Sequence, residues 1–204
     1  MALTPDFDSF ARAYEAGENQ IVYTRLAADL DTPVSLMLKL TGAAENAFVL
    51  ESVTGGDVRG RYSIIGMKPD LIWRCRGETA ALNRAARYDA DAFEDMPGDP
   101  LDRLRDVIAE SRITLPDDLP QAAAGLFGYL GYDMIRLVEH LPNVNPDPLC
   151  LPDAVMVRPS VVAVLDGVKG EVTIVSPAWV SEGQTARAAY AQAAERVMDA
   201  VRDL

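Results

Sequence analysis

The chain has few of the residues on which catalytic and metal sites most often depend. Its 204 residues include one histidine, His140, and two cysteines, Cys75 and Cys150. His140 precedes a proline-rich stretch, where we expect a solvated imidazole at a helix end. Each cysteine lies in apolar sequence, which predicts two buried thiols in a reducing cytoplasm rather than a disulfide. We therefore expect no catalytic residue and no metal ligand in this chain.

Positive charge is also scarce. There are 19 lysines and arginines against 31 aspartates and glutamates, a net charge of −12. Binding to nucleic acid or to an anionic membrane depends on clustered basic residues, and we expect neither partner. The longest apolar run, residues 122–131, is far shorter than the ~20 residues that cross a bilayer. The first residues, M-A-L-T-P-D, show no signal-peptide pattern, so we expect a cytoplasmic protein.

The composition is that of a folded protein. Apolar residues make up 49% of the chain and charged residues 25%. The length suits one large domain or two smaller interleaved subdomains. Acidic residues cluster between Asp89 and Asp99, but their spacing does not match a calcium-binding loop. Glycines 125, 128 and 131 lack the strand-turn-helix setting of a phosphate-binding loop. These residues therefore predict a folded chain with no recognisable cofactor site.

Apolar periodicity predicts a mixture of helices and strands. The fold class that we expect is α+β, with mostly antiparallel sheets covered by helices. Helical periodicity is found at residues 6–16, 33–41, 100–111, 132–140 and 182–204. Strand patterns are found at residues 20–26, 47–52, 62–65, 71–76, 121–130, 154–165 and 171–176.

Turn and cap residues mark several of the expected boundaries. Thr32 and Asp99 each precede a proline, which is typical of a helix start. Ser181 and Gln184 have the spacing of a capping box. Asp166 and the glycine after it predict a hairpin turn between two strands. The polar residues 84–98 and the proline-rich residues 141–153 are expected to be irregular.

Two stretches carry more specific patterns. In the first, residues 48–52 read F-V-L-E-S, an apolar strand that ends in a carboxylate and a hydroxyl. Residues 61–66, R-Y-S-I-I-G, follow it, and K-P-D comes close behind at residues 68–70. The second stretch, residues 128–142, reads G-Y-L-G-Y-D-M-I-R-L-V-E-H-L-P. Either stretch alone is compatible with a purely structural role.

Together these stretches resemble the N-terminal part of anthranilate synthase component I, a member of the chorismate-utilising enzymes. The resemblance covers residues 5–204. It implies the N-terminal part of that family's α/β sandwich, with residues 1–204 as one regulatory, tryptophan-sensing domain. In the family, the chorismate and magnesium sites lie in a C-terminal catalytic domain that this chain lacks. The resemblance therefore implies no cofactor here, Mg²⁺ only in the missing part, and no activity of this chain alone.

The resemblance also implies a ligand-binding site. The family places most of its L-tryptophan feedback site at the L-E-S motif, which corresponds to Leu50, Glu51 and Ser52. Arg61 and Tyr62 follow as residues that border the same pocket. A carboxylate such as Glu51 pairs with the ligand's ammonium group by a charge-assisted hydrogen bond. Ser52 and backbone N–H groups serve the ligand carboxylate, and Leu50 forms a wall for the indole ring.

The implied activity of the full enzyme is a lyase reaction of tryptophan biosynthesis. It converts chorismate and ammonia, or glutamine, into anthranilate and pyruvate. The implied partners are L-tryptophan, the chain's own C-terminal catalytic domain and a glutamine amidotransferase subunit or domain. Two alternatives stay open: the N-terminal part of aminodeoxychorismate synthase component I, of folate biosynthesis, or a free-standing amino-acid-binding or interaction module.

Overall fold

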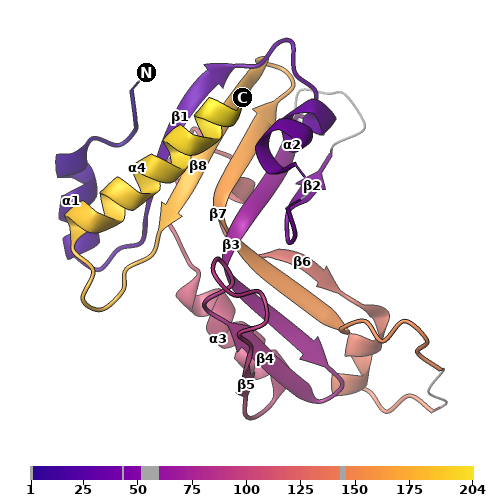
Figure 1. Cartoon of the computed structure of the whole chain (residues 1–204). Helices are drawn as coiled ribbons and strands as arrows, with labels where there is room; N and C mark the ends of the chain where they lie inside the picture. Colours follow the sequence, from indigo (N-terminus) through magenta and orange to yellow (C-terminus); the bar gives the residue numbers. More distant parts are fainter. Residues whose placement is uncertain (1, 43, 52–59, 143–145) are drawn as a thin grey trace. The chain divides into compact units, whose positions relative to one another are not determined.

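The chain forms two compact units (Figure 1). The computed structural model describes residues 2–42, 44–51, 60–142 and 146–204. Unit 1 comprises Met1–Lys68, Ile113–Ala124 and Pro159–Leu204, and unit 2 comprises Pro69–Arg112 and Gly125–Arg158. Two long strands, β3 (Tyr62–Arg76) and β7 (Ala154–Asp166), contribute residues to both units. The described strand registers are all antiparallel, which confirms the α+β class.

The sheet of unit 1 has the strand order β1-β8-β7-β3, and the short strand β2 (Phe48–Leu50) pairs with β3. β1 (Gln20–Ala27) runs beside β8 (Glu171–Ala178), with Gln20 opposite Ala178 and Ala27 opposite Glu171. β7 and β8 form the predicted hairpin, in which Asp166 lies opposite Glu171. The Asp166 carboxylate accepts hydrogen bonds from the backbone N–H groups of Val168 and Lys169. These bonds close the turn between the two strands.

Three α-helices complete the described part of unit 1. α1 (Phe7–Glu15), α2 (Pro33–Thr41) and α4 (Ala186–Asp203) begin after the capping residues Asp6, Thr32 and Thr185. Helix α4 lies along β8 and β1 (Figure 1) and buries a face of small residues against them. The largest core cluster of the unit brings together Ala28, Leu36, Leu40, Ile65, Met67, Val161, Ala163, Leu165, Val172, Ile174, Val197 and Ala200.

Unit 2 is built on the second half of β3. Ile72–Arg76 of that strand pair with β4 (Thr79–Asn83), and β4 pairs with β5 (Glu94–Met96). β6 (Phe127–Leu130) pairs with the first residues of β7. Helix α3 (Pro100–Glu110), capped by Asp99, packs against this sheet. The core of the unit comprises Leu71, Trp73, Cys75, Ala80, Leu82, Leu104, Val107, Met134 and Ala154.

Several expected elements are wrong in extent or type. Residues 62–65 and 71–76 belong to one strand, β3, within which Lys68 has a φ of 51°. Residues 121–130 are not one buried strand. They form a short 3₁₀ helix η1 (Gln121–Ala123) and then β6, separated by Gly125 at a φ of 134°. That backbone conformation is rare for residues with a side chain, and it interrupts the run.

Three further predictions differ from the structure: those for residues 84–98, for residues 132–140 and for the cap of the last helix. The polar stretch 84–98 contains strand β5 instead of being wholly irregular. The helix expected at residues 132–140 is the 3₁₀ helix η2 (Tyr132–Leu137). The last helix is capped by Thr185, because the Ser181 hydroxyl bonds to the Gln184 side chain, at 2.9 Å, instead of to the backbone. Among the described helices, none is both long and apolar enough to traverse a bilayer.

Candidate functional site

The end of strand β2 presents the first residues of the predicted ligand site. Phe48, Val49 and Leu50 lie opposite Gly66, Ile65 and Ile64 of β3. Leu50 is 52% exposed, and Glu51, directly after the strand, is exposed as well. No hydrogen bond or ion pair joins the Glu51 side chain to another residue in the described part of the chain. The strand end therefore offers a carboxylate to solvent beside a half-exposed leucine.

Tyr62 lies near Leu50 through the pairing of β2 and β3. Leu50 is directly opposite Ile64, and side chains two residues apart in a strand share a face of the sheet. Tyr62 is therefore the diagonal neighbour of Leu50, within reach of an aromatic side chain. Tyr62 is partly buried at the start of β3. Ser52, the remaining residue of the predicted L-E-S site, lies outside the described residues.

Arg61 makes a different set of contacts from the one expected of a ligand-binding residue. Its Nε lies 3.0 Å from Oδ1 of Asp166, and its Nη2 lies 2.6 Å from Oδ2 of the same carboxylate. The Arg61 guanidinium carbon is 5.0 Å from the centre of the Tyr62 ring. Hydrogen bonds from Arg61, and then from backbone N–H groups of the turn, hold the pKa of Asp166 below its usual value. The Arg61 guanidinium is thus already bonded to a carboxylate of the protein.

Sequence reasoning did not find Asp166 as part of this region. It predicted Asp166 only as a hairpin turn residue, and Arg61 is 105 positions away along the chain. A bidentate contact between an arginine and a carboxylate depends on the tertiary arrangement of β3 and the β7–β8 turn. No local pattern in the sequence signals it.

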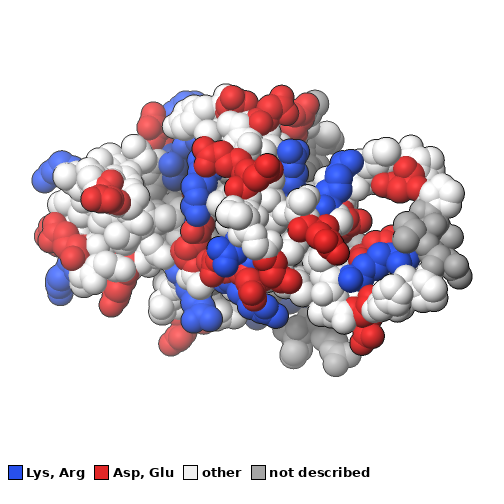
Figure 2. All heavy atoms as spheres, turned by 90° about the horizontal axis from the view of Figure 1, so that it is seen from below, with Lys and Arg blue, Asp and Glu red and all other residues white. Residues whose placement is uncertain are grey.

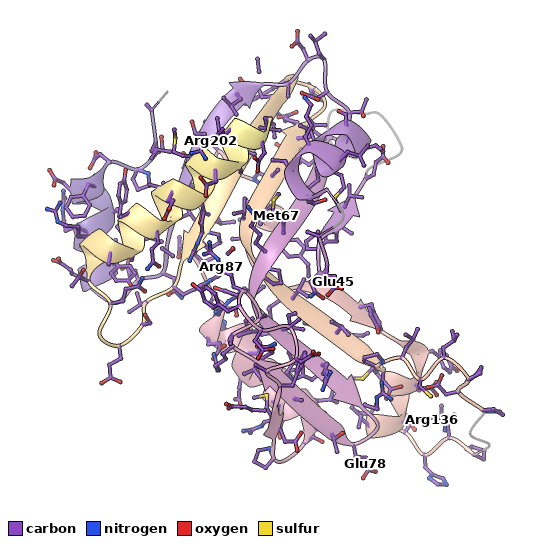
Figure 3. All side chains as sticks on the ribbon, in the orientation of Figure 1. Glu45, Met67, Glu78, Arg87, Arg136 and Arg202 are labelled. Carbon is purple, nitrogen blue, oxygen red and sulfur yellow. The ribbon has the colours of Figure 1, made fainter. Side chains whose placement is uncertain are left out.

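The second motif lies in unit 2, where it lines a cavity of about 540 Å³. Arg136 and Glu78, both labelled in Figure 3, are among the residues that line it. Arg136 bonds to Asp133 at 2.7 Å and to the Leu141 carbonyl oxygen at 2.9 Å. The Gly131 N–H donates to the carbonyl oxygen of Asp153 at 2.7 Å. The polar groups of this motif mainly bind one another and the neighbouring backbone.

The described residues include both cysteines and many acidic side chains. No group of three or more His, Cys, Asp or Glu residues among them is placed to hold a metal ion. Cys75 is buried, as expected, and burial raises the pKa of its thiol to about 11. Cys150 is exposed, contrary to expectation, because it lies in the proline-rich loop with a φ of 49°. On the face drawn in Figure 2, acidic and basic side chains are interspersed.

Comparisons with known proteins identify relatives of the chain. It is 72% identical over 198 residues to anthranilate synthase component 1 of Cereibacter sphaeroides, which covers 97% of this chain and 40% of that protein. It is 34% identical over 206 residues to anthranilate synthase component 1 of a Synechocystis species, covering 99% of this chain and 39% of that protein. The chain spans about two fifths of the length of these curated relatives. No family model matches it.

A solved structure shares the fold. The crystal structure of anthranilate synthase component I from Streptococcus pneumoniae matches with a TM-score of 0.55 and 23% sequence identity. The match covers 88% of this chain and 37% of that one. The chain is therefore homologous, over nearly all of its own length, to a part of anthranilate synthase component 1.

Proposed function

We propose that this chain contributes the L-tryptophan feedback site of anthranilate synthase component I, acting in the cytoplasm in tryptophan biosynthesis. The observation that carries the proposal is the exposed Glu51 carboxylate beside half-exposed Leu50, in a chain 72% identical to a protein of that name. The curated relatives described above bear the name anthranilate synthase component 1, which favours this enzyme over aminodeoxychorismate synthase.

The chemistry of free tryptophan fits the groups at the end of β2. Its ammonium group needs a charged acceptor, which Glu51 provides. Its indole ring needs an apolar wall, which Leu50 and the Tyr62 ring provide from neighbouring strands. Its carboxylate needs N–H or O–H donors, and Ser52 with nearby backbone amides remains our expectation for them. Groups on paired strands keep fixed positions, which favours selective binding.

Feedback inhibition requires two states of the enzyme that tryptophan binds with different affinity. A coupling free energy of about 1–3 kcal/mol between the effector site and the reacting site is typical. The reaction itself, chorismate and ammonia to anthranilate and pyruvate, is assigned to the part of the enzyme that this chain does not span. The Mg²⁺ site and the groups that receive ammonia from a glutamine amidotransferase are assigned to the same part. This chain alone is expected to convert no chorismate and to bind tryptophan weakly.

The proposal is testable in a chimera in which this chain replaces the matching segment of the Cereibacter sphaeroides protein. Ammonia-dependent anthranilate formation is followed by fluorescence at increasing tryptophan concentrations. Glu51→Gln removes the charged acceptor, and a hydrogen bond to a charged group contributes about 1.5–3 kcal/mol. The tryptophan concentration for half-inhibition should therefore rise by roughly ten- to hundredfold.

Glu45→Gln is the matched control, because Glu45 is also an exposed glutamate shortly before β2. It should leave inhibition unchanged. An unaltered response in Glu51→Gln, or loss of anthranilate formation in that variant even without tryptophan, contradicts the assignment of Glu51 to the effector site.

A further inference from the structure

Asp166 is a buried carboxylate whose two oxygens are fully engaged. Oδ1 accepts hydrogen bonds from Arg61 Nε at 3.0 Å and from the backbone N–H groups of Val168 and Lys169 at 3.1 and 3.2 Å. Oδ2 accepts from Nη2 of Arg61 at 2.6 Å. The side chain is 11% exposed, and that of Arg61 is 25% exposed. The pair is thus well shielded from solvent, and its geometry is fixed by several bonds at once.

The backbone of Arg61 is held to the same turn. The N–H of Gly167 donates to the Arg61 carbonyl oxygen at 2.9 Å. Side chain and main chain of Arg61 therefore both bind the β7–β8 turn, which fixes where β3 begins. The next residue is Tyr62, whose ring lies beside the Arg61 guanidinium. Two residues further along β3, Ile64 pairs with Leu50.

A ligand carboxylate would have to compete with Asp166 for the Nε and Nη2 edge of Arg61. Removing Arg61 from Asp166 would leave a buried carboxylate without its charged partner, which is strongly unfavourable. A donor that is already bonded in this way is poorly suited to bind a free amino acid. Its geometry is well suited to hold neighbouring residues in place.

We propose that Arg61 and Asp166 are positioning residues of the effector site, which fix Tyr62 and the start of β3 opposite Leu50, and that Arg61 does not bind the ligand carboxylate. This inference rests on the proposed function and refines it. It assigns a role to Asp166 and changes the role of Arg61 from a ligand contact to a support.

The variant Asp166→Asn in the same chimera separates the two roles of Arg61. If Arg61 bound the ligand directly, removing its competing carboxylate would free the guanidinium, and tryptophan would inhibit at equal or lower concentrations. In the positioning role, loss of the ion pair loosens Tyr62 and the start of β3. The tryptophan concentration for half-inhibition should then rise by about tenfold, which corresponds to about 1.4 kcal/mol.

Asp70→Asn is the matched control for a general loss of stability. Asp70 pairs with Arg158 in unit 2 at 2.8 Å, and their side chains are 23% and 11% exposed. This control should lower the thermal midpoint by a similar amount but leave the response to tryptophan unchanged. An equal loss of tryptophan response in Asp70→Asn would mean that any destabilisation has this effect, and the positioning role would be overturned.

The double variant Arg61→Gln/Asp166→Asn tests whether the pair acts as one unit. The effects of substituting two residues of one ion pair are not additive. The double variant should therefore lose no more tryptophan response than the more affected single variant. Additive losses would overturn the inference. If Asp166→Asn does not fold, Arg61→Lys keeps the charge and loses the bidentate contact. It should also raise the half-inhibition concentration, whereas an unchanged value would count against positioning.

The two proposals fail in different ways. If tryptophan does not inhibit the parent chimera, both the proposed function and this inference are contradicted. A parent chimera that tryptophan inhibits, with Glu51→Gln less sensitive but Asp166→Asn unchanged or more sensitive, removes the positioning role alone.

Discussion

Strands β2 and β6 are two short strands that lie off the main strand order, and each carries one of the sequence motifs. β2 pairs with β3 in unit 1, and β6 pairs with β7 in unit 2. Both expose a leucine at their last residue, Leu50 at 52% and Leu130 at 54%. They differ in the polar side chain beside it. Glu51 makes no bond to another described residue, whereas the Tyr129 hydroxyl donates to the Pro152 carbonyl oxygen at 2.8 Å.

The glycines at these two strand pairings also differ in the groups that lie against them. A Cβ at Gly66, on β3, would overlap the ring of Phe48 from β2, a side chain that is able to move. A Cβ at Gly128, on β6 itself, would overlap the carbonyl group of Val155, with its carbon at 2.8 Å. Backbone in a strand pair cannot yield as a side chain can. The first motif therefore presents side chains on an adaptable pairing, and the second holds two backbones close together.

Gly128→Val should have the largest effect on stability. The added side chain must displace the Val155 backbone, and we expect the free energy of unfolding of unit 2 to fall by about 3 kcal/mol or more. Gly128 itself is exposed, and the obstruction comes from the backbone of the neighbouring strand. Trp73, buried in unit 2, reports the change by fluorescence in a Trp179→Phe background during guanidinium unfolding. A loss below 1 kcal/mol would show that the β6–β7 contact is adaptable as well.

Gly66→Ala should cost less, about 1–2 kcal/mol, because the Phe48 ring is able to shift. The comparison is sharpened by the double variant Phe48→Leu/Gly66→Ala, in which the obstructing ring is absent. We expect the double variant to recover part of the loss, as residues in contact couple in such cycles. Thermal unfolding followed by circular dichroism measures all three variants. Strict additivity would mean that Phe48 does not limit the space at Gly66.

Lowering the pH should have a smaller effect on stability, and this effect should depend on the ion pair between Arg61 and Asp166. The pKa of Asp166 is lowered in the folded chain, chiefly by its hydrogen bonds with Arg61. A lowered folded pKa gives stability that is present above the unfolded value, about 3.9, and is lost as the pH falls through the folded value. The stability difference between the parent chain and Asp166→Asn should therefore shrink as the pH is lowered from 5 towards 3. Urea unfolding at each pH measures it, and a constant difference would contradict the assignment.

Local chemistry predicted the helix starts well. Thr32 and Asp99 accept hydrogen bonds from the first turn of α2 and α3, as their side chains and the prolines after them indicate. The hairpin at Asp166 was also readable, because a turn residue pair separates two apolar runs. In each case the signal and the interaction lie within a few residues of one another.

Some of the errors arose where distant residues decide the outcome. Strand β5 was missed because Glu94–Met96 are polar, and only their pairing with β4 makes them a strand. One error was local: Ser181 was expected to cap the last helix, but its hydroxyl bonds to Gln184, and Thr185 takes that place. At the candidate site, Leu50 and Glu51 stay predictions from the motif resemblance, whereas the partner of Arg61 depends on tertiary structure.

The smallest expected effects decide most directly whether β2 and β6 differ in role. Tyr129→Phe removes the hydrogen bond to Pro152, a partly exposed interaction that contributes about 0.5–1 kcal/mol. Glu51→Gln removes no bond to a described residue, and its unfolding free energy should match that of the parent chain within error. Guanidinium unfolding of both variants beside the parent measures the two values. If Glu51→Gln proves the more destabilising, Glu51 stabilises the fold, and the distinction between a ligand-facing β2 and a structural β6 fails.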